Sequence, residues 1–402
     1  MKKNKNLNSP SQEETTTLSR RDFVKTAGGS LALLSFGMSS VLALDPKNQT
    51  IETPKIVWLL LRGALDSLHV VVPTFEQQYK VLRPKLSSSF KTQLLPLEQG
   101  FALHPSLKNL HTWYQDKSLL PIVAVSSGYQ QRSHFDGQDY LESGKTEIDH
   151  DSGWLARAID VKNKRALAVS RSTPITLRGS DQVNTWYPSK LKTSDDDIYV
   201  ALEMLYQDDN ALKESLDSGL EVRGLVGDNM GKGGKRQGQF IDLAKDCAQL
   251  MVGEEGVDCA MLELGGWDTH NNQARQLDKK LTELDQGLAE LKAGLGKEWK
   301  NTVVIIGTEF GRTAKENGTG GTDHGTGSAL FMAGGAINGG KVLGNWPGLN
   351  PAELFQRRGL LPTTNSFSWI GNVLSQHWDF TEQELMQVFS HVKAYDQAII
   401  RS

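Results

Sequence analysis

Short apolar runs alternate with amphipathic stretches along most of this chain, and the alternation predicts its secondary structure. The first run, KIVWLLL at residues 55–61, lies between Pro54 and Gly63 and predicts a buried strand. Beyond it, apolar residues recur at helical spacing. We predict further strands at 119–125, 166–169, 258–264, 302–307 and 328–332, and helices at 104–116, 195–206, 239–251, 273–295, 366–377 and 382–392.

This order of elements indicates the α/β class. Short buried strands separated by helices are typical of a doubly wound, mainly parallel sheet flanked by helices. Residues 175–235 are more polar and less periodic, so we expect a small cap or insertion there. Within that range, residues 226–238 contain five glycines and three basic residues, which predicts a flexible loop.

The N-terminal segment has the pattern of an export signal. Residues 19–25 read S-R-R-D-F-V-K, and residues 26–44 carry no charge. This pattern predicts a twin-arginine signal peptide at 1–44 ahead of one α/β domain at 45–402. The expected partner is the twin-arginine translocase, and the expected location is periplasmic or extracellular. We expect no stable membrane span after cleavage, and an uncleaved anchor is the alternative.

Composition narrows the classes of partner and of site. The formal net charge of the 402 residues is −3 at pH 7, so no nucleic-acid partner is expected. The two cysteines, Cys247 and Cys259, form no C-x-x-C pair, which argues against zinc-ribbon and thioredoxin-like sites. We expect two buried free thiols, with a disulfide between them as the alternative.

Polar side chains gather directly after the predicted strands. In open parallel sheets, ligands bind beyond the carboxyl ends of the strands, so these positions are the candidate site. The candidates are Asp66 and Ser67 after the first strand, Arg132, Ser133 and His134 after the second, Asp268 and His270 after 258–264, Glu309 and Arg312 after 302–307, and Asn317, Asp323 and His324 before 328–332.

These residue types suit a metal centre that binds an oxyanion. Carboxylates and imidazoles bind zinc, manganese or calcium, and arginines donate bidentately to phosphate or sulfate oxygens. Structural roles are the alternatives: Asp66 as a helix cap, Glu309 and Arg312 as an ion pair, and His134 as a core histidine. The metal-binding candidates are Asp66, Asp268, His270, Glu309, Asp323 and His324; the substrate-binding candidates are Arg132, Arg312 and Asn317; the catalytic candidates are Ser67, Ser133 and His134.

Taken together, the motifs resemble a known family. RGALDSL, RSHFDGQD, GGWDTHNNQ and TEFGRT followed by NGTGGTDHG stand in the order and spacing of the bacterial family called domain of unknown function 1501. That family looks like a distant branch of the alkaline phosphatase and sulfatase superfamily. The resemblance implies an alkaline-phosphatase-like fold with a divalent metal at the strand ends. It implies metal-binding roles for Asp66, Asp268, His270, Glu309 and His324.

The sequence also departs from the superfamily pattern. Phe310 follows Glu309 where a histidine is expected, and Gln130 or Gln131 stands where a nucleophile would fall. Two functions therefore stay open. The first is an exported metal-dependent hydrolase of phosphate or sulfate esters, with a small anionic ester or glycan as substrate. The second is a non-catalytic binding or assembly protein on the same fold.

Overall fold

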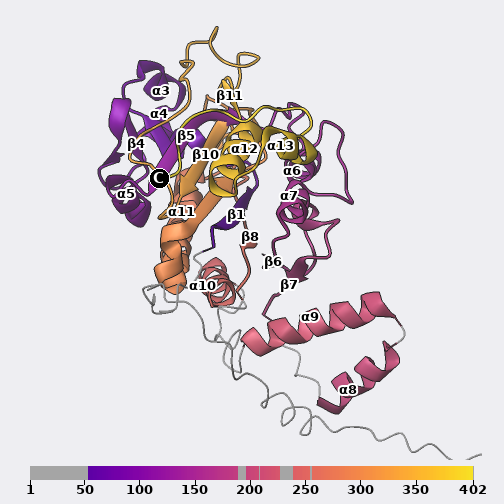
Figure 1. The fold of residues 1–402 in the computed structure, drawn as a ribbon. Helices are drawn as coiled ribbons and strands as arrows, with labels where there is room; N and C mark the ends of the chain where they lie inside the picture. Colours follow the sequence, from indigo (N-terminus) through magenta and orange to yellow (C-terminus); the bar gives the residue numbers. More distant parts are fainter. Residues whose placement is uncertain (1–52, 189–195, 208, 227–238, 254–255, 402) are drawn as a thin grey trace, which may run out of the picture. The chain divides into compact units, whose positions relative to one another are not determined.

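Eight strands form one sheet at the centre of the described residues, in the order β11, β5, β10, β9, β1, β8, β6 and β7 (Figure 1). The structure is a computed structural model that describes residues 53–188, 196–207, 209–226, 239–253 and 256–401. The strands are β1 (Lys55–Arg62), β5 (Leu119–Ser126), β6 (Ala166–Ala168), β7 (Val183–Thr185), β8 (Cys259–Gly265), β9 (Thr302–Gly307), β10 (Ser328–Ala333) and β11 (Thr364–Asn365).

The pairing of these strands is mainly parallel. β1 pairs in parallel with β8 and β9, and β6 pairs in parallel with β8 and β7. β10 is antiparallel to both of its neighbours, β9 and β5, and β11 is parallel to β5. The prediction of a doubly wound, mainly parallel sheet is therefore confirmed.

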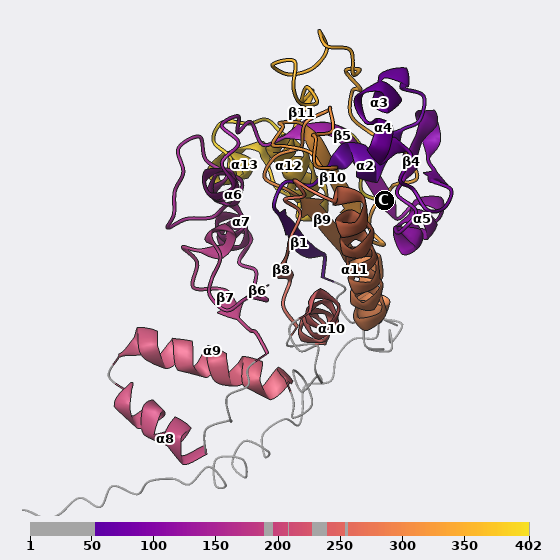
Figure 2. The ribbon, with the colours of Figure 1, turned by 180° about the vertical axis from the view of Figure 1, so that it is seen from behind.

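Helices cover both faces of the sheet (Figure 2). Along β1 the side chains alternate between two buried layers because neighbouring residues of a strand point to opposite faces. Val57 and Leu59 pack in the layer of α5, α10 and α11, whereas Ile56 and Trp58 pack in the layer of α7, α12 and α13. The longer helices are α5 (Lys108–Gln115), α6 (His134–Ser143), α7 (Trp154–Lys162), α8 (Asp196–Leu205), α9 (Asn210–Val226), α10 (Phe240–Met251), α11 (Gln273–Leu295), α12 (Ser366–His377) and α13 (Glu382–Val388).

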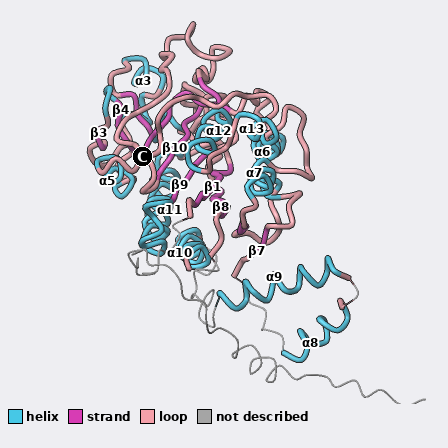
Figure 3. The backbone as a smooth tube through the Cα atoms, viewed as in Figure 1, coloured by secondary structure: helices cyan, strands magenta, loops and turns pink. Residues whose placement is uncertain are grey.

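A smaller antiparallel sheet follows β1. Its strands are β2 (Val71–Pro73), β3 (Leu95–Pro96) and β4 (Phe101–Leu103), with β4 in the middle. The short helices α2 (Ser67–Val70), α3 (Gln77–Leu82) and α4 (Pro84–Ser87) lie in the same part of the chain. The sequence pattern predicted none of these elements, nor α6 and α7, which Figure 3 shows as helices. They are too short or too weakly amphipathic to give a clear period.

Some predicted boundaries were wrong. The helix predicted at 104–116 begins only at Lys108, after a turn that holds Pro105. The last helix ends at Val388 rather than at residue 392, because Phe389 has an extended backbone (φ −132°, ψ 90°). Within 175–235, β7 forms the edge of the main sheet, and α8 and α9 follow it.

The structure describes the predicted cysteine thiols but not the predicted signal segment. Cys247 and Cys259 are both buried free thiols, as expected. No helix among the described residues is long and apolar enough to span a membrane. The signal predicted at 1–44 and nearly all of the loop predicted at 226–238 lie outside the described residues.

Candidate metal centre

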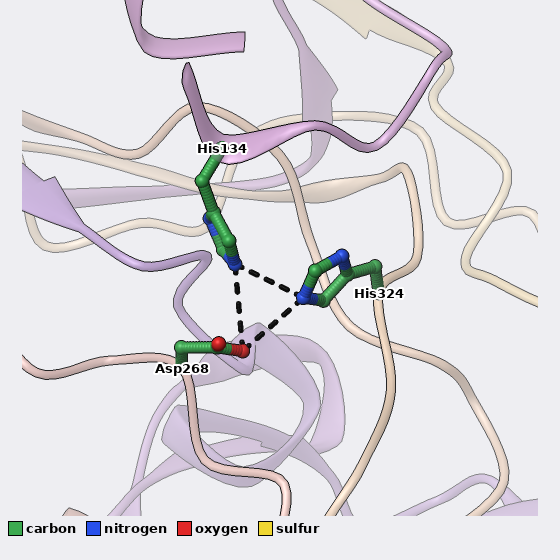
Figure 4. A group of neighbouring side chains, drawn as sticks. All are labelled: His134, Asp268 and His324. Atoms are coloured by element: carbon green, nitrogen blue, oxygen red, sulfur yellow. Dashed lines mark hydrogen bonds and ion pairs between the residues drawn. The ribbon is translucent and has the colours of Figure 1, made fainter. Parts of the chain in front are cut away.

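Three histidines and one aspartate from three different loops converge on one point. His134 is the first residue of α6, after β5; Asp268 and His270 lie between β8 and α11; His324 lies between β9 and β10. The Nε2 atom of His324 is 3.0 Å from His134 Nε2, 3.1 Å from His270 Nε2 and 3.2 Å from Asp268 Oδ1. Figure 4 shows His134, Asp268 and His324 pointing toward one another. We call these four residues the histidine cluster.

Asp268 contacts every other member of the cluster through one oxygen. Its Oδ1 atom is 2.9 Å from His270 Nε2 and 3.4 Å from His134 Nε2. Arg312 Nη1 donates to the same oxygen. Burial raises the pKa of Asp268, but the hydrogen bond and charge of Arg312 outweigh burial, so the pKa lies below its usual value. The carboxylate is therefore ionised at neutral pH.

Each imidazole of the cluster is held through its Nδ1 atom. All three partners are acceptors, so each Nδ1 carries a proton that it donates. A neutral imidazole with a proton on Nδ1 has a free lone pair on Nε2, and the three lone pairs meet in the cluster. The acceptors are Glu309 Oε1 for His134 (2.8 Å), Asp323 Oδ1 for His270 (3.1 Å) and the Arg132 carbonyl for His324 (2.9 Å).

Glu309 is fully buried and orients His134. Its carboxylate accepts from the Gly63 amide (2.8 Å), from Gln138 Nε2 (2.9 Å) and from Thr308 Oγ1 (2.9 Å). Burial raises the pKa of Glu309, and the hydrogen bonds from His134 and Gln138 lower it below its usual value. The hydrogen bond between His134 and Glu309 also raises the pKa of His134.

Two close backbone approaches shape the loops of the cluster. Gly63 has φ +120°, and a Cβ atom there would lie 2.6 Å from the amide nitrogen of Asp268. A Cβ at Gly321 would lie 2.4 Å from the carbonyl carbon of His270. Trp267 is fully buried and donates through Nε1 to the Leu264 carbonyl (2.7 Å), which anchors the loop to the end of β8.

Two arginines, Arg132 and Arg358, lie beside the cluster, and neither forms an ion pair with a carboxylate within the described part of the chain. Arg132 donates to Gln356, and its Nε atom is buried with no partner among the described residues. Arg358 is exposed and donates through Nε to the His324 carbonyl (2.9 Å). Burial and the charge of Arg358 lower the pKa of Arg132. The pair therefore places positive charge next to the cluster.

The geometry and the donor set fit a divalent metal. Two ligand atoms on one tetrahedral zinc, each about 2.0–2.1 Å from it, lie roughly 3.3 Å apart. Three corresponding separations here, among His134, Asp268 and His324, are 3.0, 3.2 and 3.4 Å. Imidazole nitrogens with a carboxylate oxygen suit zinc, and an acceptor on each Nδ1 is the usual support for a metal-bound histidine. The side chains of His134 and His324 are 22% and 25% exposed, so solvent reaches the centre.

Asp66 is a predicted metal ligand that the structure does not bring into the cluster. It is 1% exposed, and Arg83 donates to both of its oxygens, at 2.7 and 2.9 Å. Gln273 donates to it as well. The carboxylate is saturated by protein donors, so its surroundings do not support a metal-binding role.

Glu309 and Asp323 are predicted metal ligands, and the structure places them behind the histidines of the cluster. Each accepts from the Nδ1 atom of a cluster histidine instead of joining the converging atoms. His134 was predicted as a catalytic candidate, and it is instead one of the converging imidazoles.

The two serine candidates have structural surroundings. Ser133 is the N-cap of α6 and accepts from the Asp136 amide (3.4 Å). Ser67 is buried at the start of α2, and its amide donates to the Leu65 carbonyl (3.0 Å). Neither residue makes a contact with the histidine cluster among those found in the described part of the chain.

Two of the predicted substrate-binding residues are occupied by internal contacts. Arg312 is 1% exposed, and it donates to Asp268, to Thr322 Oγ1 (3.2 Å) and to the Thr322 carbonyl. Asn317 donates to the His270 carbonyl (2.8 Å) and accepts from the amides of Thr319 and Gly321, both at 3.0 Å. Arg312 therefore orients Asp268, and Asn317 organises the loop around His270.

Sequence reasoning missed Gln138 and Arg358. Gln138 lies four residues, about one helical turn, after His134, so the two side chains share one face of α6. Because the sequence pattern did not predict α6, the two residues were not recognised as neighbours. Arg62 Nη1 donates to Gln138 Oε1 (2.8 Å), which continues the hydrogen-bonded chain that begins at Glu309. Arg358 belongs to none of the motifs, and no signal in the sequence singles it out.

Comparison with known proteins gives a family and several distant folds. A family model described as "Protein of unknown function (DUF1501)" matches residues 53–365. No curated protein matches the sequence.

Three solved structures show the level of structural similarity. Alkaline phosphatase from the Antarctic bacterium TAB5 is 12% identical, with coverage of 73% of this chain and 95% of that one at a TM-score of 0.36. An alkaline phosphatase superfamily protein from Vibrio parahaemolyticus is 11% identical, with coverage of 80% and 66% at 0.39. The phosphonate monoester hydrolase from Silicibacter pomeroyi is 10% identical, with coverage of 80% and 73% at 0.39. Similarity at this level says nothing about the chemistry of this chain.

Proposed function

The chain belongs to the DUF1501 family, whose function is unknown, and we propose that it is a metal-dependent hydrolase of phosphate or sulfate esters. One observation carries the proposal. The Nε2 atoms of His134 and His324 and the Oδ1 atom of Asp268 lie 3.0–3.4 Å from one another, His270 Nε2 lies 2.9 Å from that oxygen and 3.1 Å from His324 Nε2, and every imidazole Nδ1 already donates to an acceptor.

This arrangement needs a cation. Lone pairs on converging nitrogen and oxygen atoms repel one another in the absence of positive charge. A proton on one Nε2 would relieve one contact at a time. A divalent metal would relieve these contacts together, and His134, Asp268 and His324 would hold it, with His270 beside them. When bound, the metal would supply Lewis acidity and an activated water.

The surrounding residues have separate tasks in this proposal. Glu309, Asp323 and the Arg132 carbonyl fix the orientation of the three imidazoles. Arg312 holds the Asp268 carboxylate. The guanidinium groups of Arg132 and Arg358 bind the anionic oxygens of the ester, since guanidinium matches phosphate and sulfate geometry and neither group forms an ion pair with a carboxylate of the described residues.

A hydrolysis assay tests the proposal directly. The zinc-loaded and manganese-loaded full chain is incubated with 4-nitrophenyl phosphate and 4-nitrophenyl sulfate, and release of 4-nitrophenol is followed. We expect turnover of at least one ester that chelation abolishes and metal restores. His324→Ala should remove the activity, and Lys297→Gln, an exposed lysine outside the cluster, should keep it.

A second function is favoured because neither serine candidate, Ser67 or Ser133, contacts the histidine cluster in the described part of the chain. Ser133 caps a helix, and Phe310 packs its ring against His134 at a centroid distance of 4.9 Å where a further ligand could otherwise have stood. A chain that binds metal but hydrolyses neither ester would be a non-catalytic binding or assembly protein. Stoichiometric metal without turnover of either ester decides for that alternative.

We also propose export of the folded chain by the twin-arginine translocase to the periplasm or beyond. The support is the S-R-R-D-F-V-K motif ahead of an uncharged segment. A fusion of residues 1–44 to a folded reporter enzyme tests this step. We expect export that Arg20→Lys together with Arg21→Lys stops. A reporter that stays in the cytoplasm with the native segment would contradict the proposal.

A further inference from the structure

A second cavity lies outside the histidine cluster, beside the first turn of α11. Its volume is about 750 Å³, within the size range of small-molecule sites. His69, Phe90, His104, Lys108 and Arg275 are among the residues that line it. None of its lining residues belongs to the histidine cluster, and we call it the α11 cavity.

The two histidines of the α11 cavity present hydrogen-bond donors. Tyr79 OH lies 3.5 Å from His69 Nδ1, and the Ser106 amide donates to His104 Nδ1 (3.1 Å). With Nδ1 as the acceptor, the proton of each neutral ring sits on Nε2. His69 is fully buried, and its Nε2 atom has no partner within the described residues. Such an orphan buried donor needs an acceptor.

The start of α11 adds backbone donors to the same cavity. Asn272, the N-cap, has a left-handed backbone and its side chain caps no amide. The Gln273 amide donates to the Gly320 carbonyl (2.9 Å), but the amides of Ala274 and Arg275 find no acceptor in the described parts of the chain. Asn272 and Ala274 line the cavity. The N-terminus of a 23-residue helix with free amides favours an anion.

The two carboxylates that line the α11 cavity, Asp278 and Asp285, already accept hydrogen bonds from protein groups. Asp285 accepts from the amides of Asn109 (3.1 Å) and Leu110 (3.0 Å) and so caps α5. Asp278 accepts from Lys91 and from Ser106 Oγ (2.7 Å). Lys108 and Arg275, by contrast, have no ion-pair partner among the residues that the structure describes. The cavity therefore offers donors and positive charge with no free acceptor to balance them.

We propose that the α11 cavity binds a small molecule that carries a carboxylate or phosphate group. The anion would accept from the His69 and His104 Nε2 donors and from the first amides of α11, with Lys108 and Arg275 as its countercharges. The stacked rings of Phe90 and His69, 4.5 Å apart at 17°, form an apolar wall for the body of the molecule.

Calorimetric titration with sodium benzoate and with inorganic phosphate tests the proposal. It is done on the full chain carrying His324→Ala, in which the histidine cluster is broken. We expect saturable binding of at least one anion with a stoichiometry of one. In that background, Arg275→Gln and Lys108→Gln should each weaken it by about tenfold, the effect of one lost charge-assisted hydrogen bond. His69→Phe should weaken it too.

Controls separate this cavity from the metal centre and from general charge effects. Lys297→Gln removes an exposed positive charge that does not line the cavity, and it should leave binding unchanged. Binding that occurs only when His324 and the metal are present would place the anion at the histidine cluster and overturn the proposal. Binding of neither anion, or equal binding in Arg275→Gln and Lys108→Gln, would also overturn it.

Discussion

Asp66 and Asp268 stand at equivalent places, each in the loop after a central parallel strand, yet their surroundings differ. Asp66 follows β1, is 1% exposed, and accepts two of the hydrogen bonds that the Arg83 guanidinium donates, one on each oxygen. Asp268 follows β8, is 40% exposed, and its Oδ1 atom lies 2.9–3.4 Å from the Nε2 atoms of three imidazoles. Asp66 is enclosed by protein donors, whereas Asp268 faces the histidine cluster as well as Arg312. We call Asp66 and Arg83 the buried pair.

The partners of a carboxylate after a strand decide whether it is available to bind a metal. A buried arginine satisfies the charge completely and leaves the residue with a structural role. Arg312 donates to Asp268 through one nitrogen only, and its other two nitrogens donate to Thr322. Arg312 therefore orients the Asp268 carboxylate but leaves its remaining acceptor positions free for other partners. We therefore expect changes at the buried pair to alter stability, and changes at the histidine cluster to alter metal binding.

The largest effect is predicted for Arg83→Met. It leaves the Asp66 carboxylate buried and unpaired, which costs about 3–5 kcal/mol of unfolding free energy in comparable sites. Urea unfolding of the metal-free chain measures the loss, and Lys85→Met on the exposed side of α4 is the matched control. The zinc content of the folded variant should stay the same. A loss of unfolding free energy in Arg83→Met no larger than that in Lys85→Met would contradict the distinction between the buried pair and the histidine cluster.

The buried region should also respond to acid through stability. Burial lowers the pKa of His69 to about 3, and the unfolded value is about 6.5. The unfolded chain therefore binds a proton that the folded chain refuses, and stability falls as pH drops from 6.5 toward 3. Between pH 6.5 and 5 this one residue accounts for about 2 kcal/mol. Unfolding free energies of wild type and His69→Phe should differ in slope over that range; identical slopes would contradict the assignment.

A smaller effect, on metal affinity, is expected for Gln138→Leu. Gln138 is one of four donors to Glu309, which orients His134. Loss of an outer support of this kind weakens metal binding about 10–100-fold, and we expect about tenfold because the other donors remain. Competition with a zinc chelator measures the affinity. Asp139→Asn, on the same helix but without contact to Glu309, should leave it unchanged, and equal affinities in both variants would exclude the positioning role.

The smallest effect is predicted for Arg358→Gln. The guanidinium is exposed, so a lost charge contact is worth about 1 kcal/mol or less, or about fivefold in KM for the ester. Metal content and kcat should not change, since Arg358 holds only the carbonyl of His324. Steady-state kinetics on the metal-loaded chain separate the two constants. A fall in kcat with unchanged KM would assign Arg358 a different task.

The sequence predicts the sheet and names all four residues of the cluster as candidates, Asp268, His270 and His324 as metal ligands and His134 as a catalytic residue, because both leave local signals. Strands such as β9 are short apolar runs, and His270 and His324 lie in glycine-containing loops that flank such runs. The buried pair could not be predicted, because Arg83 belongs to no motif and reaches Asp66 only through tertiary packing. Arg358 was missed for the same reason, whereas Gln138 was missed because helix α6 was not predicted. The opposite roles of Asp66 and Asp268 depend on partners that are distant in sequence.

Equilibrium zinc titration of the metal-free full chain, compared with the same titration of His324→Ala, measures whether the histidine cluster binds a metal. We predict one tight zinc per wild-type chain and an affinity loss in His324→Ala greater than the 10–100-fold that outer supports give. Unfolding of the two metal-free chains should be similar. A wild-type chain that binds no zinc, manganese or calcium, or a His324→Ala chain that binds zinc equally well, would contradict this prediction.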